Sequence, residues 1–370
     1  MDNWTLIARV APAALVLALV TACADAPVAP TVARSALTPL PAALAADSYT
    51  PVELFPDATG PTAAFALNDR GQVAVRDFFV SEGAERGRAY LWTPDGPNAE
   101  TGQATVLKMP FGTPETSHAF DINNRGVVVG SVVGPFGGTS AVVWTTDIGT
   151  PLSGTKAVAI NNRGYVVTQN GSDASLWTPP GTSGAGWQAY PLGSFTASAI
   201  NDRGDIVGVK VGLGAAVWRP NEPGGVTGEF FALGSFAGGS GTPFDINDRG
   251  DIVGVESTGG GELAVLWEPT GPNATTFTVT NLNPVIDATN AFATGINNKG
   301  EVTGGGAITG LNWRTLWVWH PGGKPGSSGT VTILGSSFPS EVLTDKRGPV
   351  INSHGDVAFE LDGNAILWRK

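Results

Sequence analysis

A short pattern occurs seven times in this chain of 370 residues: a hydrophobic residue, then Asn, two variable residues and Gly. The seven asparagines are Asn68, Asn123, Asn161, Asn201, Asn247, Asn297 and Asn352. Repeats of about 40 to 50 residues are too small to bury an apolar face alone, so they stack on one another. The region from about Tyr49 to Trp368 is therefore predicted to form one repeat domain.

Each repeat predicts four short strands. The first strand ends at the aliphatic residue before Asn, and Asn-x-x-Gly is typical of a type I turn whose Gly takes a left-handed conformation. A Val- and Ile-rich second strand follows, the third reads Ala-x-(Leu or Val)-Trp in most copies, and the fourth is looser. Such units predict an all-β fold, a seven-bladed β-propeller of four-stranded antiparallel blades.

The two ends of the repeat region predict how the ring closes. The last repeat has only three strands, ending in Ala365–Trp368, while Thr50–Leu54 precedes the first Asn and looks like an unpartnered fourth strand. Pairing the two segments completes the last blade and removes an exposed sheet edge.

The amino terminus predicts export. Arg9 is followed by an apolar run from Val10 to Ala22, which has the length of a signal-peptide core and is too short to span a bilayer. The single cysteine, Cys23, closes this run. We expect residues 1–22 to be a signal peptide, 23–47 an Ala- and Pro-rich tether, and 48–370 the propeller.

The residues Val20-Thr21-Ala22-Cys23 resemble the bacterial lipobox. The resemblance implies that Cys23 is the lipidated first residue of the mature protein, an outer membrane lipoprotein that contacts the membrane only through its anchor. The alternative is ordinary signal-peptidase cleavage near Ala24-Asp25-Ala26, which would release a freely extracellular protein.

The repeat units Ile-Asn-x-x-Gly-x-Val-x-Gly and Ala-x-Leu-Trp resemble the HAF-type extracellular repeats of bacteria. The family name refers to a His-Ala-Phe sequence on the third strand, whereas the only His-Ala-Phe here begins at His118, on a first strand. The resemblance covers about 320 residues and implies an exported repeat protein. It implies no catalytic activity.

Charged residues recur at the turns. Arg, Lys or His precedes each Gly, and an acid follows it in four copies, Asp205, Asp251, Glu301 and Asp356. We expect solvated, locally paired turns, with an anion-binding ring as the alternative. The net charge of −11 argues against nucleic acid as a partner. A cation occupies a ligand position in the acidic turns, so neither a metal site nor a cofactor is expected.

Candidate binding residues lie where the repeat is broken. Trp313 and Trp317, with Trp319, share parity on one extended segment and could stack sugar rings, while the alternative is packing between blades. Trp187, in a longer insertion, is a second candidate for an exposed ring.

A catalytic motif is not evident. The three histidines show no metal-ligand spacing, and neither a nucleophile elbow nor a phosphate loop occurs. The acids that break the repeat are expected to lie in surface loops: Asp77, Glu82, Glu256 and Asp287. No catalytic residue is therefore assigned.

Two functions remain open. The first is a monomeric surface binding or scaffold propeller for a polysaccharide or an envelope protein. The second is a carbohydrate-active hydrolase or lyase that uses acids at the central channel.

Overall fold

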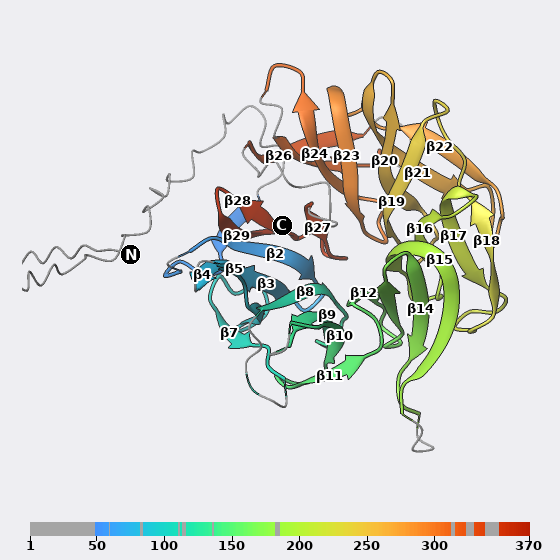
Figure 1. Cartoon of the computed structure of the whole chain (residues 1–370). Coiled ribbons are helices and arrows are strands. Elements are labelled where there is room, and N and C mark those ends of the chain that lie inside the picture. Colours follow the sequence, from blue (N-terminus) through green and yellow to red (C-terminus); the bar gives the residue numbers. More distant parts are fainter. Residues whose placement is uncertain are drawn as a thin grey trace, which may run out of the picture. The chain divides into compact units, whose positions relative to one another are not determined.

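The computed structural model describes residues 49–370 apart from 59, 82–83, 110–111, 113–115, 135–136, 182–185, 312–314, 323–328 and 337–347. These residues form strands joined by turns and loops, and no helix occurs among them. Each repeat contributes antiparallel strands in chain order, with the first strand innermost (Figure 1). The described chain is thus a β-propeller arrangement of four-stranded antiparallel blades.

Five sheets have four strands each. Their strands are β2 (Thr62–Leu67), β3 (Val73–Asp77), β6 (Ala89–Pro94) and β7 (Gly102–Val106); β8 (Thr116–Ile122), β9 (Val128–Val133), β10 (Thr139–Trp144) and β11 (Gly149–Leu152); β19 (Ser240–Ile246), β20 (Ile252–Thr258), β21 (Gly261–Pro269) and β22 (Phe277–Asn281); β23 (Ala288–Ile296), β24 (Val302–Ile308), β25 (Thr315–His320) and β26 (Thr330–Ser336); and β27 (Val350–Ile351), β28 (Val357–Leu361), β29 (Asn364–Arg369) and β1 (Thr50–Glu53). A small hairpin, β4 (Phe79–Ser81) with β5 (Ala84–Arg86), projects from the first of them.

The third and fourth repeats share one seven-stranded sheet, whereas seven separate sheets were expected. Its strands are β12 (Lys156–Ile160), β13 (Val166–Asn170), β14 (Asp173–Thr178), β15 (Gln188–Ile200), β16 (Ile206–Lys210), β17 (Gly214–Pro220) and β18 (Gly228–Ala232). The cause is the 13-residue strand β15. Its first half pairs with β14 and its second half with β16, and the chain passes from one repeat to the next through an irregularity at Gly193, whose φ is 69°.

The predicted pairing of the two ends is confirmed. Strand β1 lies antiparallel to β29, with Thr50 opposite Arg369 and Glu53 opposite Ile366. Val52 and Leu54 are both buried against the neighbouring sheets. Figure 1 shows the consequence, because the blue strand β2 and the red strands β28 and β29 lie side by side.

The core is divided among the contacts between neighbouring sheets. Seven clusters of buried side chains occur in the described residues, and each contains or contacts the tryptophan that ends one repeat's Ala-x-(Leu or Val)-Trp segment or its equivalent. These are Trp92, Trp144, Trp177, Trp218, Trp267, Trp319 and Trp368. Trp267, for example, packs on Val207 and Val217 of the preceding repeat. The predicted packing of the repeat tryptophans between blades is therefore confirmed.

Candidate functional site

One end of the propeller carries both the Asn-x-x-Gly turns and the loops that join third to fourth strands. Antiparallel strands alternate in direction, so these two sets of connections emerge on the same side. We call this side the turn face. It is built from the seven turns and from loops such as 95–101, 221–227 and 270–276.

The asparagine of each turn is a cross-link as well as a turn residue. In the third repeat, Asn161 Oδ1 accepts hydrogen bonds from the backbone N–H groups of Arg163 and Tyr165, at 3.1 and 2.9 Å. Its Nδ2 donates to the backbone oxygen of Asn201 in the next repeat, at 3.0 Å. The side chain therefore closes its own hairpin and also holds the neighbouring one.

The same donor bond recurs at every repeat and closes on itself. Asn352 Nδ2 donates to the oxygen of Asn68, at 3.2 Å, and so joins the last repeat to the first. The seven links run 68 to 123, 123 to 161, 161 to 201, 201 to 247, 247 to 297, 297 to 352 and 352 to 68. All seven asparagines are buried. We call this set the asparagine ring.

The turn prediction is confirmed, but it missed this second role. The glycine of every turn has a positive φ, from 71° at Gly71 to 99° at Gly355. Asp and Ser also suit the first position of a type I turn, yet all seven copies have Asn. A carboxylate has no donor and a serine hydroxyl has one oxygen for both roles, whereas an amide has an acceptor oxygen and a separate donor nitrogen, so that uniformity was the available signal.

A second polar belt lies at the residue after each asparagine, at the mouth of the central channel. At six of the seven junctions its backbone N–H donates to the corresponding side chain of the next repeat, as Asp202 does to Asp248 at 2.9 Å. Three of these side chains are acids, Asp69, Asp202 and Asp248, and each accepts bonds from neighbouring repeats. The channel acids are thus engaged in holding repeats together.

The pKa of Asp69 reflects this engagement. Burial acts to raise it, but hydrogen bonds from the backbone and hydroxyl of Ser353 and from Asn124 outweigh burial and keep the pKa below its usual value. Asp69 is therefore held as a carboxylate, which suits hydrogen-bond acceptance and does not suit proton donation at neutral pH.

The acids that follow the turn glycines are buried, so the expectation of solvated turns was wrong for them, whereas the expected local pairing occurs between Arg249 and Asp251 at 2.7 Å. Asp205, Asp251, Glu301 and Asp356 each donate their backbone N–H to the turn Asn and face a residue that follows a third-strand tryptophan. Asp205 pairs with Arg219 at 3.3 Å, and Asp356 pairs with Arg369 at 3.1 Å. For Asp205, Glu301 and Asp356, a cross-strand partner holds the acid inside the sheet edge instead of on the turn surface.

Glu301 is the centre of the densest of these networks. Its Oε1 accepts bonds from His320 Nδ1 at 3.0 Å and Lys370 Nζ at 2.7 Å, and its Oε2 accepts from Asn297 at 2.7 Å. Burial acts to raise the pKa of Glu301, but these bonds outweigh it and lower the pKa to about 2. His320 Nε2 lies 3.3 Å from the hydroxyl of Thr332, so an acid, an imidazole and a hydroxyl stand in line. Thr332 is only 3% exposed, which keeps a substrate from its hydroxyl.

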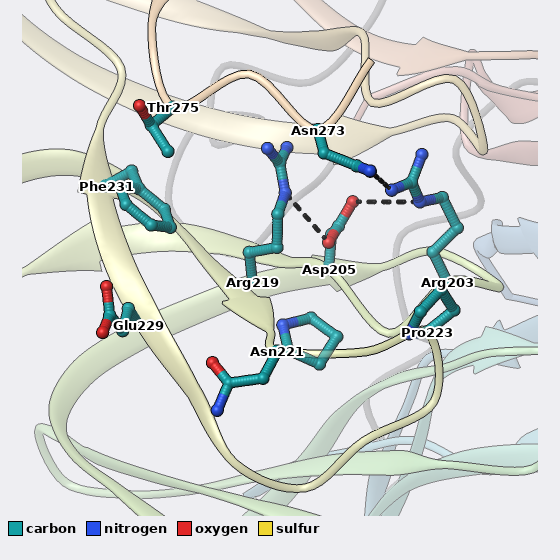
Figure 2. A pocket seen from close by; sticks show the side chains of 10 residues that line it. Arg203, Asp205, Arg219, Asn221, Pro223, Glu229, Phe231, Asn273 and Thr275 are labelled. Carbon is teal, nitrogen blue, oxygen red and sulfur yellow. Dashed lines mark hydrogen bonds and ion pairs between the residues drawn. The ribbon is translucent and has the colours of Figure 1, made fainter.

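Two cavities on the turn face lie beside these buried pairs. The first, of about 240 Å³, is lined by Arg203, Asp205, Arg219, Pro220, Asn221, Pro223, Glu229, Phe231, Asn273 and Thr275. We call it the Arg219 cavity. Figure 2 shows Arg203 and Arg219 on either side of Asp205, and Arg203 Nη2 donates to Asn273 Oδ1 of the next repeat.

The second cavity, of about 600 Å³, lies where the last repeat meets the first. It is lined by Asp69, Arg70, Gly71, Gln72, Thr93, Pro94, Gly96, Pro97, Asn98, His354, Asp356 and Arg369. We call it the Arg369 cavity. Both cavities offer amides, guanidinium groups and paired carboxylates, which are groups for hydrogen-bond recognition.

Of the three tryptophans predicted to bind a ligand, one is fully buried, one is half-buried and one lies outside the described residues. Trp317 is fully buried in the cluster between β21 and β25, together with Trp319, so its ring offers no surface for stacking. Trp187 is half-buried and packs near Trp177. Trp313 lies outside the described residues, as do Cys23 and the predicted signal peptide and tether.

The acids that break the repeat have structural partners. Glu256 was expected in a surface loop, but it is buried and accepts bonds from the backbone of Phe236, Ala237 and Gly239. Burial acts to raise the pKa of Glu256, but these three bonds and a fourth from the Ser235 hydroxyl outweigh burial and lower the pKa. Asp77 binds Arg88 and Tyr90. Asp287 adopts a positive φ of 52° in a turn, and Glu82 lies outside the described residues.

The described residues contain neither a metal-binding cluster nor a membrane-spanning helix. No cluster of three or more His, Cys, Asp or Glu side chains among the described residues is arranged to hold a metal ion. The described part of the chain also contains no helix with the length and apolarity needed to cross a bilayer.

Comparison with known proteins gives distant structural likenesses alone. No family model matches the chain, and neither does any curated protein. A streptogramin B lyase structure shares 14% identity at a TM-score of 0.49, covering 87% of this chain and 97% of its own. YCF48 with a bound peptide shares 13% at 0.46, covering 88% and 97%. A lectin of Aleuria aurantia in complex with α-methyl-L-fucoside shares 12% at 0.35, covering 79% and 99%. Such values carry no argument about function.

Proposed function

We propose that this protein is a seven-bladed propeller that binds a glycan or an envelope protein on its turn face. The number seven is supported by the seven hydrophobic clusters and by the asparagine ring. The seven-stranded sheet then counts as two blades that share β15, because its two halves carry separate turns at Asn161 and Asn201.

The observation that carries a binding role is that three hollows open on the turn face. The Arg219 cavity, the Arg369 cavity and the channel mouth are all lined by turn residues. The asparagine ring fixes the backbone beneath them, and a binding surface on a fixed backbone loses little conformational entropy when a ligand binds. The acids nearby already accept hydrogen bonds, so this arrangement favours recognition over acid–base catalysis.

Export and lipid attachment belong to the same proposal. They are supported by the apolar run before Cys23 and by the lipobox-like residues around it. A monomeric propeller held at the outer membrane by one lipidated cysteine would present its turn face to the surrounding glycans and proteins of the envelope. The HAF-type resemblance fits the same location.

Site-directed blocking tests which face binds. In a Cys23→Ser background, Thr93→Cys or Asn221→Cys places a single thiol on the turn face, and Val211→Cys places one on an exposed loop at the opposite end. Each protein is labelled with a bulky maleimide and tested against a panel of polysaccharides and purified envelope proteins. We expect loss of binding only with the turn-face labels. Loss only with the label at position 211, or no ligand for unlabelled protein, would refute the proposal.

A further inference from the structure

The Arg219 and Arg369 cavities are two copies of one design. Each has a third-strand arginine, Arg219 or Arg369, paired with the acid that follows a turn glycine, Asp205 or Asp356. Each is completed by the next repeat, through a loop with the sequence Gly-Pro-Asn-Ala, at 271–274 and at 96–99. A group present in one copy can therefore be compared directly with its counterpart in the other.

The two loops have the same backbone geometry. Asn273 and Asn98 both have φ 58°. Ala274 N–H donates to Gly271 O at 3.0 Å, and Ala99 N–H donates to Gly96 O at 3.1 Å. The cavity arginine bonds to the alanine carbonyl in each case, from Arg219 at 2.5 Å and from Arg369 at 3.5 Å. The loops thus present their asparagines in equivalent positions.

The two turns differ at two positions, Asp202 and Arg203 in one and Ser353 and His354 in the other, and the second of these positions faces the cavity. In the Arg219 cavity, the guanidinium of Arg203 reaches across and donates to Asn273 Oδ1. His354 occupies the equivalent position in the Arg369 cavity, and its shorter side chain makes no such bond. The cavity with histidine has a volume of about 600 Å³, against about 240 Å³ for the cavity with arginine.

The wider cavity contains hydrogen-bonding groups that the described protein does not use. The side chain of Asn98 has no hydrogen bond within the described residues, and neither does the exposed guanidinium of Arg70. Arg369 Nε is buried without a partner in that part of the chain. The Arg219 cavity shows that the equivalent oxygen, Asn273 Oδ1, accepts an N–H donor from across the cavity.

Charge and shape narrow the chemistry of the occupant. The formal charges of Arg70 and Arg369 equal those of Asp69 and Asp356 in number, so with His354 neutral the cavity lining carries no net charge to attract an ion. A hydroxyl group can donate to Asn98 and accept from Arg70 at once. Pro94 and Pro97 add apolar surface for the C–H groups of a ring. We propose that the Arg369 cavity binds a neutral sugar unit of an oligosaccharide. This inference rests on the proposed function and names its ligand class and site.

Substitutions that narrow the Arg369 cavity, or that remove the asparagine amide from either cavity, test the proposed site. His354→Arg installs the counterpart of Arg203, and Asn98→Gly removes the amide while keeping a residue that tolerates positive φ. Asn273→Gly is the matched control in the Arg219 cavity. The probes are maltotriose, cellotriose, mannotriose, chitotriose and a uronate trisaccharide, titrated calorimetrically. We expect one site per chain and about tenfold weaker binding in His354→Arg and Asn98→Gly, the effect of one or two lost hydrogen bonds, with Asn273→Gly unchanged.

A gain-of-function variant makes the test two-sided. Arg203→His opens the Arg219 cavity in the same way, and we expect it to raise the number of bound sugars from one to two. Circular dichroism and the thermal midpoint show whether each variant is folded, and if His354→Arg fails to fold, Asn98→Gly decides. Saccharide binding equal in all variants would overturn the site, and binding only of a uronate trisaccharide would overturn the neutral ligand. Binding only of an envelope protein would overturn this inference but leave the proposed function standing, whereas absence of any ligand removes both.

Discussion

The asparagine ring predicts a large loss of stability when one member is truncated. Asn161→Ala removes one donor bond to Asn201 and two acceptor bonds from Arg163 and Tyr165, all at a site that is 3% exposed. A buried hydrogen bond contributes about 1 kcal/mol, so three give a loss of about 3 kcal/mol in the free energy of unfolding. The partners left behind are buried backbone groups, and this works in the same direction.

Urea denaturation followed by tryptophan fluorescence measures this loss as a shift in midpoint at constant m-value. Asn98→Gly is the control, because that side chain has no bond in the described structure, and it should change the free energy by less than about 0.5 kcal/mol. Asn161→Asp separates the two roles of the amide. It keeps the acceptor but loses the donor at neutral pH, and stability should partly return at acidic pH, where the new carboxyl can donate. A loss for Asn161→Ala no larger than that of Asn98→Gly would refute the reasoning.

Three further predictions concern closure, pH and the anchor. Deleting residues 49–55 removes β1, exposes the edge of β29 and leaves a cavity where Val52 and Leu54 were buried. The thermal midpoint of the whole propeller should therefore fall strongly, and an unchanged midpoint would contradict the closure. Because the pKa of Glu301 is lowered to about 2, its contribution to the free energy of unfolding is present above pH about 4.5 and is lost as pH falls toward 2. Glu301→Gln should therefore be less stable at pH 7 and should lose less stability between pH 5 and 2. Parallel curves of stability against pH for wild type and variant would contradict this. Cys23→Ser should abolish incorporation of a palmitate analogue in cells and release the protein from membranes, whereas continued labelling would contradict a lipid anchor on this residue.

Much of the fold could be read from the sequence because the repeat is local. The strand order of each unit, the left-handed glycine at positions such as Gly204 and the pairing of β1 with β29 follow from patterns within about 50 residues and from the avoidance of a free sheet edge. The continuous strand β15 was not predicted. Leu192-Gly193-Ser194 resembles a loop between repeats, and only the pairing partners on both sides keep it in the strand, with Gly193 at a φ of 69°.

The candidate site was less accessible to sequence reasoning. Trp317 was selected as an aromatic that breaks the pattern, but whether a strand face meets solvent or a neighbouring sheet depends on what packs against it. Conversely, His354 and Asn98 are 256 positions apart and individually ordinary, and they share a cavity only because the last and first repeats meet. The two Gly-Pro-Asn-Ala copies were a visible signal, yet their meaning depended on which arginine faced each of them.

The sequence by itself determined the unit: the hairpin, its glycine, the tryptophan on the third strand and an asparagine at every turn. These are set by backbone sterics and by hydrophobic periodicity, which act between near neighbours in the chain. The tertiary structure alone decided that each asparagine holds the next repeat and that its ring closes from Asn352 to Asn68. It also decided that Arg203 fills the Arg219 cavity while the Arg369 cavity stays open. The residues that meet in each cavity are far apart in the chain, so their separation in the sequence does not predict their distance in space.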